Sequence, residues 1–180
     1  MTEKINPSFL AGYIDCDGGF QLQVNIRKST SGRKNIRLNP RISISFKDGK
    51  KQREVLEAIR DVVGGSIYFS NEGKENAKVN WMTTNVEDCI RVARYVLPCL
   101  CQKEEIAKRF IWACEVISNG KTRRKGTNMY GGEKIYSKEE MIEMVKIATS
   151  LNETMQVVRF RESTGRNFNF YLKEIDQIYS

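Results

Sequence analysis

Two carboxylates lie two residues apart in the stretch at residues 10–18, which reads Leu-Ala-Gly-Tyr-Ile-Asp-Cys-Asp-Gly. An apolar run precedes them and Gly18-Gly19 follows, so Asp15 and Asp17 are expected at the C-terminal end of a helix. That end is the negative pole of the helix dipole, where an acidic side chain costs stability. A divalent cation such as Mg²⁺, which prefers carboxylate and phosphate oxygens, would offset the cost. A carboxylate that only hydrogen-bonds in the turn is the simpler alternative, and spacing alone favours it.

A second group of reactive side chains lies on two alternating segments after this turn. Residues 18–47 include seven Lys or Arg and no acidic residue. Alternation places one polar set on a single face, namely Gln21, Gln23, Asn25, Arg27, Arg37, Asn39, Arg41, Ser43, Ser45 and Lys47. Amide and guanidinium groups read base edges, while Lys and Arg neutralise phosphates. A solvated sheet face is the simpler alternative, but such a face usually mixes charge signs.

The composition also favours a polyanionic partner. The 180 residues carry a net charge of +8. Residues 120–126 form a separate basic cluster, in which Lys121, Arg123 and Arg124 are the expected phosphate contacts. An ordinary surface loop is the simpler alternative for this cluster. The absence of His excludes Ser or Cys catalysis with a His base, and a His-containing zinc site. Five cysteines without a CxxC pair favour buried, reduced thiols in a cytosol-like compartment. We expect neither a signal peptide nor a membrane-spanning helix.

The periodicity predicts alternating helices and strands. Asn6-Pro7 is a good helix start, because Asn caps and Pro fits the first turn. The expected elements are that helix, strands at 20–27 and 36–47, a helix at 50–63, strands at 66–70 and 78–84, and helices at 85–97, about 102–118 and 137–151. Pro40 suggests an edge strand or a bulge, and Ser137 with Glu140 forms a capping box. The tail from Thr154 is left unassigned.

Residues 10–18 resemble the signature of the LAGLIDADG homing endonuclease family, from which they differ only by Tyr13 in place of Leu and Cys16 in place of Ala. The context is also similar, because a helix carries the motif and two basic alternating strands follow. The expected order αββαββα extends the resemblance to about Leu151. It implies an α+β fold with an antiparallel, saddle-shaped sheet and additional C-terminal helices. We expect one domain over residues 1–180, with a core at about 5–151 and a tail at 152–180.

The resemblance implies a site-specific endonuclease that hydrolyses double-stranded DNA with Mg²⁺ or another divalent cation. The chain holds one motif copy, and single-motif members are homodimers with long, near-palindromic targets. Small residues such as Gly12 and Cys16 would let two motif helices approach closely at the two-fold axis, although packing within one subunit is the competing explanation. The expected interface residues are Leu10, Gly12, Tyr13, Asp15 and Cys16.

The family's site residues are carried over by position. Asp17 is the expected catalytic metal ligand, joined by the backbone carbonyl of Cys16, and Asp15 is expected to cap the partner motif helix. Lys103, at a helix start after a Pro-containing apolar segment, is the candidate for orienting water or stabilising charge. A polar or basic side chain after the second strand would complete the water network, and the choice among Lys50, Lys51 and Arg53 stays open. DNA contacts are expected from Gln21, Gln23, Asn25, Arg27, Arg37, Arg41, Ser43, Ser45 and Lys47 on the first two strands. Further contacts are expected from Ser66, Tyr68, Ser70, Lys78, Asn80 and Met82 on the second hairpin.

Three alternatives differ in what the chain would do. An intron maturase of the same fold would bind RNA to assist splicing, and a regulator would bind DNA without cleaving it. The presence of both motif acids disfavours these two. A generic basic RNA-binding or ribosome-associated protein would show salt-sensitive binding without sequence selectivity.

Overall fold

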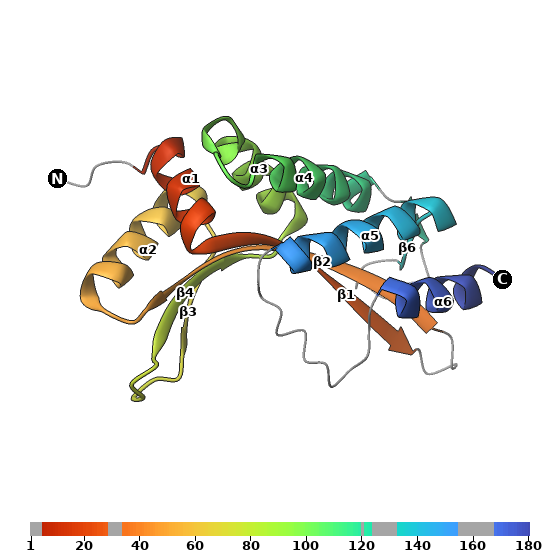
Figure 1. Cartoon of the computed structure of the whole chain (residues 1–180), viewed down its shortest axis with the longest axis horizontal. Coiled ribbons are helices and arrows are strands. Elements are labelled where there is room, and N and C mark those ends of the chain that lie inside the picture. Colours follow the sequence, from red (N-terminus) through yellow and green to blue (C-terminus); the bar gives the residue numbers. More distant parts are fainter. Residues whose placement is uncertain (1–4, 29–33, 120, 124–132, 155–167) are drawn as a thin grey trace.

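Helices and strands alternate through the part of the chain that this computed structural model describes, which is residues 5–28, 34–119, 121–123, 133–154 and 168–180 (Figure 1). The elements are α1 (Pro7–Cys16), β1 (Gly18–Lys28), β2 (Lys34–Lys47), α2 (Lys50–Val63), β3 (Ser66–Ser70), β4 (Lys78–Thr83), α3 (Val86–Val96), the 3₁₀ turn η1 (Leu97–Cys99), α4 (Glu104–Asn119), β5 (Lys121–Arg123), β6 (Glu133–Ile135), α5 (Lys138–Thr154) and α6 (Phe168–Tyr179). The predicted order αββαββα is confirmed from α1 to α3.

Four strands form one antiparallel sheet in the order β1-β2-β4-β3. Figure 1 shows this sheet as an arch, with α1, α3 and α4 above it and the β1–β2 and β3–β4 hairpins descending on opposite sides. The central strand β2 pairs with β1 from Lys34 to Ile44, but with β4 only from Ile42 to Lys47. Pro40 lies in the part of β2 that has β1 as its only strand partner, so the predicted edge position is confirmed there.

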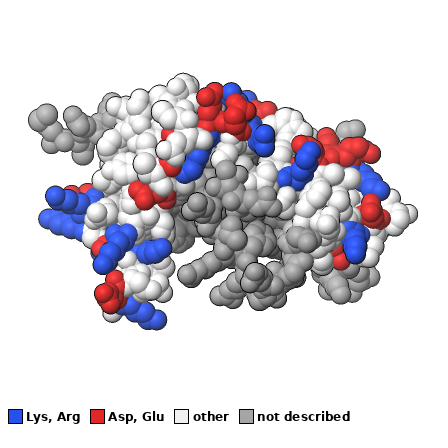
Figure 2. All heavy atoms as spheres, viewed as in Figure 1, with Lys and Arg blue, Asp and Glu red and all other residues white. Residues whose placement is uncertain are grey.

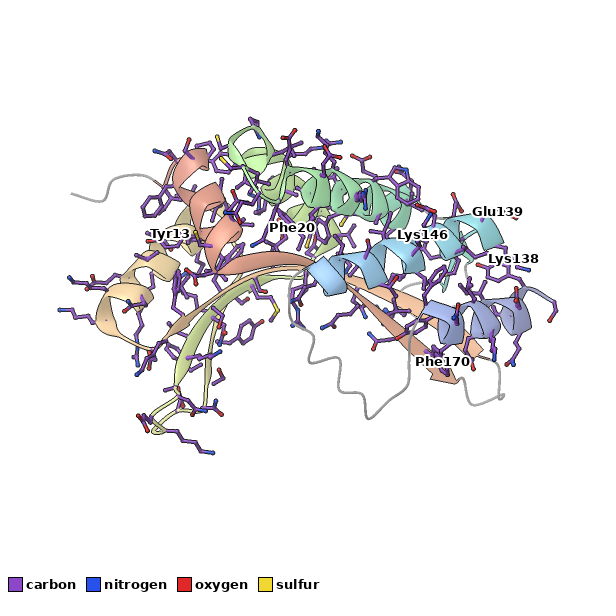
Figure 3. The ribbon with its side chains drawn as sticks, viewed as in Figure 1. Tyr13, Phe20, Lys138, Glu139, Lys146 and Phe170 are labelled. Atoms are coloured by element: carbon purple, nitrogen blue, oxygen red, sulfur yellow. The ribbon has the colours of Figure 1, made fainter. Side chains whose placement is uncertain are left out.

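Strict alternation along the strands decides which face is buried. Phe20, Leu22, Ile42 and Trp81 have no exposed surface and form the core under the helices. Phe20 leaves β1 toward α4, where its ring centroid lies 5.3 Å from that of Phe110 (Figure 3). The intervening polar residues therefore share the opposite, outer face of the sheet, as the alternation predicts.

Capping residues set the start of three helices. The Asn6 side chain accepts a hydrogen bond from the Phe9 N–H at 2.8 Å, and the Asn85 side chain accepts one from the N–H two residues on at 2.9 Å. The predicted capping box is confirmed, because Glu140 N–H donates to the Ser137 hydroxyl at 3.0 Å and Ser137 N–H donates to the Glu140 carboxylate at 2.8 Å. These starts depend only on residues close in the sequence.

The end of α2 depends instead on a distant indole. Gly64 and Gly65 have φ of +76° and +91°, which favour glycine, and the Trp81 indole N–H donates to the Gly64 carbonyl at 2.7 Å. A Cβ on Gly65 would lie 2.7 Å from the Trp81 Nε1. The predicted helix stop is confirmed, and the close approach of Trp81 explains why Gly65 carries no side chain.

The C-terminal part contains elements that the sequence pattern does not predict. The tail left unassigned contains α6, a β5–β6 hairpin follows α4, and α4 begins at Glu104 rather than at residue 102. The Tyr179 hydroxyl donates to the Tyr136 carbonyl at 2.8 Å, and Lys138 pairs with Asp176 at 2.9 Å, so α6 is held against the start of α5. Among the described residues, no helix is both long and apolar enough to span a bilayer.

The cysteines only partly match the prediction of buried thiols. All five are free; Cys89 and Cys114 are buried, but Cys16 and Cys101 are exposed. Burial raises the pKa of the Cys89 thiol to about 12, so this thiol stays protonated and inert at neutral pH. The two exposed thiols lie where α1 ends and where α4 is about to begin.

Candidate nucleic-acid interface and catalytic site

The end of α1 presents Asp17 at the junction between helix and sheet. Asp17 is the C-cap residue, and its N–H donates to the Tyr13 carbonyl at 2.8 Å. Its carbonyl accepts a hydrogen bond from the Ser45 N–H of β2 at 3.4 Å. Asp17 is exposed, and its carboxylate makes no hydrogen bond with a described residue. This carboxylate is therefore fixed in position by its own backbone while its oxygens stay available.

Asp15 is engaged within its own chain. Its carboxylate accepts hydrogen bonds from the backbone N–H groups of Cys101, Gln102 and Lys103 at 2.8, 3.3 and 3.1 Å. These N–H groups precede the first turn of α4, so Asp15 satisfies donors that otherwise lack partners at a helix N-terminus. The Asp15 carboxylate therefore caps α4 of its own chain, which η1 brings to it, and the expected contact with the motif helix of a partner stays a prediction.

Lys103 lies at the predicted site but is bound to backbone. Its Nζ donates to the carbonyls of Ile14, Asp15 and Gly18 at 2.6, 2.7 and 3.0 Å, which uses all three ammonium N–H groups. Burial lowers the pKa of Lys103, and the nearby charge of Asp15 opposes that shift. The ammonium neutralises the negative end of α1, so the structure assigns Lys103 a positioning contact with the turn that carries Asp17. A direct catalytic role for Lys103 stays a prediction.

Lys50, Lys51 and Arg53 are the candidates for the side chain after β2 that would complete the water network, and the structure shows how their surroundings differ. Arg53 forms a bidentate pair with Asp48 at 2.7 and 2.6 Å, and its guanidinium lies 4.8 Å from the Phe69 ring centroid. Arg53 is therefore paired within its own chain, whereas Lys50 and Lys51 are exposed in the first turn of α2, and the choice among the three stays a prediction. The residue of the second strand that contacts Asp17 is Ser45.

The outer face of the sheet aligns polar residues in rows. The register places Gln21 opposite Arg41, Gln23 opposite Asn39 and Asn25 opposite Arg37; further along, Ser43, Ser45 and Lys47 lie opposite Met82, Asn80 and Lys78, which in turn pair with Ser66, Tyr68 and Ser70. No residue of β1 to β4 is acidic. Basic and amide groups without competing carboxylates form a surface suited to a polyanion with readable edges.

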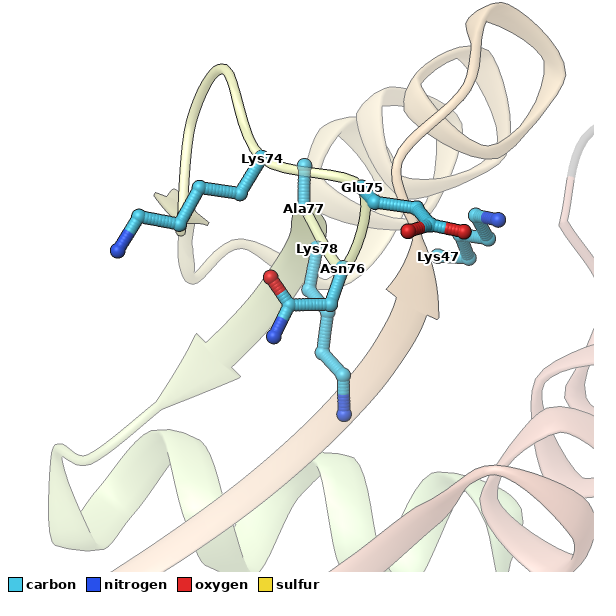
Figure 4. Close-up of a pocket in the computed structure, with 6 residues that line it drawn as sticks. All are labelled: Lys47, Lys74, Glu75, Asn76, Ala77 and Lys78. Atoms are coloured by element: carbon cyan, nitrogen blue, oxygen red, sulfur yellow. The ribbon is translucent and has the colours of Figure 1, made fainter.

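A basic hollow lies where these rows meet the β3–β4 turn. Lys47 and Lys78 face each other across β2 and β4, and Lys74 and Glu75 of the turn join them in lining a hollow of about 690 Å³ (Figure 4). Figure 2 shows Lys and Arg side chains projecting over α2 and this hairpin. Three lysines against the single Glu75 carboxylate leave the hollow with a net positive charge, which suits an anion. The sequence reasoning missed Lys74, because a lysine in a polar turn carries no periodic signal.

The expected interface residues fall into two groups. Leu10 is fully buried in the core of its own chain, so the prediction that Leu10 contributes an interface surface is wrong. Gly12 and Cys16 are exposed, and a Cβ added at Gly12 would meet nothing within 4 Å. Tyr13 is partly buried between the rings of Phe9 and Phe46 at 4.8 and 5.3 Å (Figure 3). Phe9, which the sequence reasoning also missed, adds a 44% exposed ring to this side of α1.

Four predicted contacts lie partly or wholly outside what is described. Arg27 belongs to β1, and Lys121 and Arg123 belong to β5, but their side chains are not described. Arg124 lies outside the described residues. For these four residues the predicted DNA contacts stay predictions.

The donors at the end of α1 fit a hard cation but do not enclose one. Among the described residues, no group of three or more Asp, Glu, Cys or His side chains converges on a point. The Asp17 carboxylate and the Cys16 carbonyl are oxygen donors, which Mg²⁺ and Ca²⁺ prefer. Because these cations take about six or more oxygen ligands, one chain supplies only part of such a site, and phosphate, water or a second chain would have to supply the rest.

Comparisons with known proteins agree with this geometry. The family described as LAGLIDADG endonuclease matches residues 10–98. The fold is similar to that of an archaeal intron-encoded homing endonuclease, I-Vdi141I, complexed with DNA; the TM-score is 0.65, with 21% identity over 96% of this chain and 95% of that chain. It is also similar to the homing endonuclease I-TnaI, with a TM-score of 0.62 and 18% identity over 98% and 99% of the two chains.

A third similar structure is the homing endonuclease I-CvuI in complex with its target in the presence of calcium. The TM-score is 0.60, with 16% identity over 82% of this chain and 80% of that chain. A comparison with curated protein sequences found no match. At these identities the likeness to solved structures concerns the fold.

Proposed function

Because the chain belongs to the LAGLIDADG endonuclease family, we propose that it cleaves both strands of a long, near-palindromic DNA target as a homodimer, with Mg²⁺ or another divalent cation. The observation that carries this proposal is the exposed Asp17 carboxylate at the junction of α1 and β1. This carboxylate lies directly before β1, the first strand of the polar outer face, and none of the four strands contains an acidic residue. A duplex on that face is attracted by basic groups, and the Asp17 carboxylate, unlike that of Asp15, is available to a metal.

The chain's own residues position each reacting partner. Asp17 and the Cys16 carbonyl would hold the cation, which when bound activates water and stabilises charge on the phosphate oxygens. Lys103 and Asp15 join the end of α1 to the start of α4, which fixes the turn that carries Asp17. Basic groups of the outer face neutralise phosphates and set the register of the duplex.

We infer the homodimer from the number of candidate metal sites in one chain. One chain offers a single Asp17, whereas cutting two strands requires two sites related by the symmetry of the target. The exposed part of α1, with Phe9, Gly12 and Cys16, is apolar or small and permits close approach of a second copy. The target's near-palindromic sequence would mirror the two-fold axis of the protein.

The decisive test is Asp17→Asn, which preserves shape but removes the charge. Duplexes that bind the wild-type protein are first selected from a randomised library with Ca²⁺ present. We expect wild type to cleave the selected duplex with Mg²⁺ and Asp17→Asn to lose cleavage by at least about a hundredfold while still binding it. The matched control is Asp61→Asn on α2, where the carboxylate pairs only with the neighbouring Arg60 on an exposed surface.

Three results would count against the proposal. Cleavage retained by Asp17→Asn would exclude Asp17 as the metal ligand, and equal loss in Asp61→Asn would indicate a nonspecific charge effect. Selective binding of structured RNA in place of any duplex would favour the maturase alternative. Binding that depends steeply on salt but yields no consensus would favour a generic basic protein.

A further inference from the structure

Asn80 occupies the middle of the polar outer face and is tied to its neighbour strand. It lies on β4 between Ser45 of β2 and Tyr68 of β3, and its side chain is half-buried. Its Nδ2 donates to the Tyr68 backbone carbonyl at 3.4 Å and to the Ser70 hydroxyl oxygen at 3.2 Å. The two amide N–H groups of Asn80 are therefore both directed toward β3.

The Tyr68 carbonyl decides the orientation of the Asn80 amide. A carbonyl oxygen only accepts hydrogen bonds, so the NH₂ group and not the Oδ1 of Asn80 must face it. The Asn80 Oδ1 accepts no hydrogen bond from any residue that the structure describes. Because both donors are committed to β3, the side chain offers a ligand on the outer face one acceptor and no donor.

We propose that Asn80 determines specificity at one base pair of each half-site by accepting a hydrogen bond through Oδ1 alone. In the major groove, adenine and cytosine present an amino donor, whereas guanine and thymine present a carbonyl acceptor. An acceptor therefore selects amino bases over keto bases. An Asn with a free amide would instead bind adenine in a bidentate manner, through both the amino group and N7. The tied NH₂ of Asn80 cannot reach N7, so adenine and cytosine become equivalent.

This assignment rests on the proposed function, because it requires a duplex read on the outer face. The chain offers a matched control in Asn39, which lies opposite Gln23 on the other hairpin of the same face. Within the described part of the chain, the Asn39 amide has no hydrogen-bond partner, so it is not tied as Asn80 is. Asn39→Ala should thus alter a different base-pair position from Asn80→Ala.

The first measurement compares base-preference profiles. Wild type, Asn80→Ala and Asn39→Ala are each used with Ca²⁺ to select duplexes from a randomised library. We expect wild type to have one position per half-site where adenine and cytosine are bound about equally and roughly tenfold better than guanine or thymine. Asn80→Ala should relax that position alone, and Asn39→Ala should leave it unchanged.

The second measurement uses the wild-type protein and so does not depend on how a variant folds. With adenine at the identified position, 7-deazaadenine, which lacks the N7 acceptor, should bind as well as adenine. Purine, which lacks the amino group, should bind about tenfold more weakly. Loss of affinity with 7-deazaadenine, a strong preference for adenine over cytosine, or a folded Asn80→Ala with an unchanged profile would each overturn the assignment. A selection without any consensus would instead overturn the proposed function, so the two failures are distinguishable.

Discussion

The Lys103 ammonium joins the end of α1 to the start of α4, and its removal should destabilise the fold. Lys103→Met keeps the apolar stem but removes the three N–H groups that reach the carbonyls of Ile14, Asp15 and Gly18 at 2.6, 2.7 and 3.0 Å. A hydrogen bond to a charged group contributes about 1.5–3 kcal/mol net. Because Lys103 is partly exposed and water can reach part of this turn, we expect a total loss of about 2–4 kcal/mol rather than the sum of three bonds.

Urea denaturation followed by circular dichroism measures this loss. The midpoint should fall while the dependence on denaturant stays unchanged, since the surface exposed on unfolding is the same. Lys108→Met is the matched control, because Lys108 pairs only with exposed Glu104 and Glu105 on α4; its effect should stay within about 1 kcal/mol.

A double-mutant cycle tests whether the two contacts form one unit. Asp15→Asn weakens the reciprocal contact, in which the Asp15 carboxylate accepts from the start of α4. Because both contacts join the same two helix ends, we expect a coupling energy of about 0.5–3 kcal/mol between Asp15→Asn and Lys103→Met. A Lys103→Met protein as stable as wild type would refute the reasoning, as would strict additivity with Asp15→Asn.

Three further predictions concern other parts of the chain. The Arg53 guanidinium, hydrogen-bonded to Asp48, holds the pKa of that carboxyl below its usual value, so the stabilisation is present above about pH 4 and is lost as the pH falls through the lower folded value. Asp48→Asn should therefore flatten the acid side of a curve of melting temperature against pH, and an unchanged curve would contradict the pairing. Gly65→Ala places a Cβ 2.7 Å from the Trp81 Nε1 at a φ of +91°, and should lower the free energy of unfolding by about 1–3 kcal/mol in thermal denaturation. Lys78→Ala should reduce the slope of log K against log salt by about 1 for the selected duplex, and an unchanged slope would exclude a phosphate contact.

The parts of the fold that could be predicted are those whose causes are local. The alternation of residues 20–27 and 36–47 predicts which side chains share a face, because successive strand residues point to opposite sides. The caps at Asn6, Asn85 and Ser137 predict helix starts because their partners lie within three residues. The tail that contains α6 was not predictable in the same way, since α6 is held by residues such as Tyr136, more than forty positions away.

In the candidate site, too, the sequence predicts local features and misses contacts between distant residues. The motif spacing is enough to single out Asp17, whose carboxylate stays exposed beside the sheet. It does not reveal that Asp15 caps α4 of its own chain, because nothing near Asp15 in the sequence shows that the N–H groups before α4 lie beside it. It also gives no sign that Arg53 forms a bidentate pair with Asp48, because the sequence alone does not show which way either side chain turns.

The family motif, the acid-free polar face and the charge that favours a polyanionic partner can all be read from the amino-acid sequence. Each of these depends on residue type and on spacing along the strand or helix. Three other features become visible in the folded chain alone: Lys103 binds the carbonyls at the end of α1, Ser45 contacts Asp17, and Asn80 turns its donors toward β3. These hydrogen bonds join groups that lie 10 to 89 positions apart in the sequence. Such groups meet only when the helices and strands have packed around a common core.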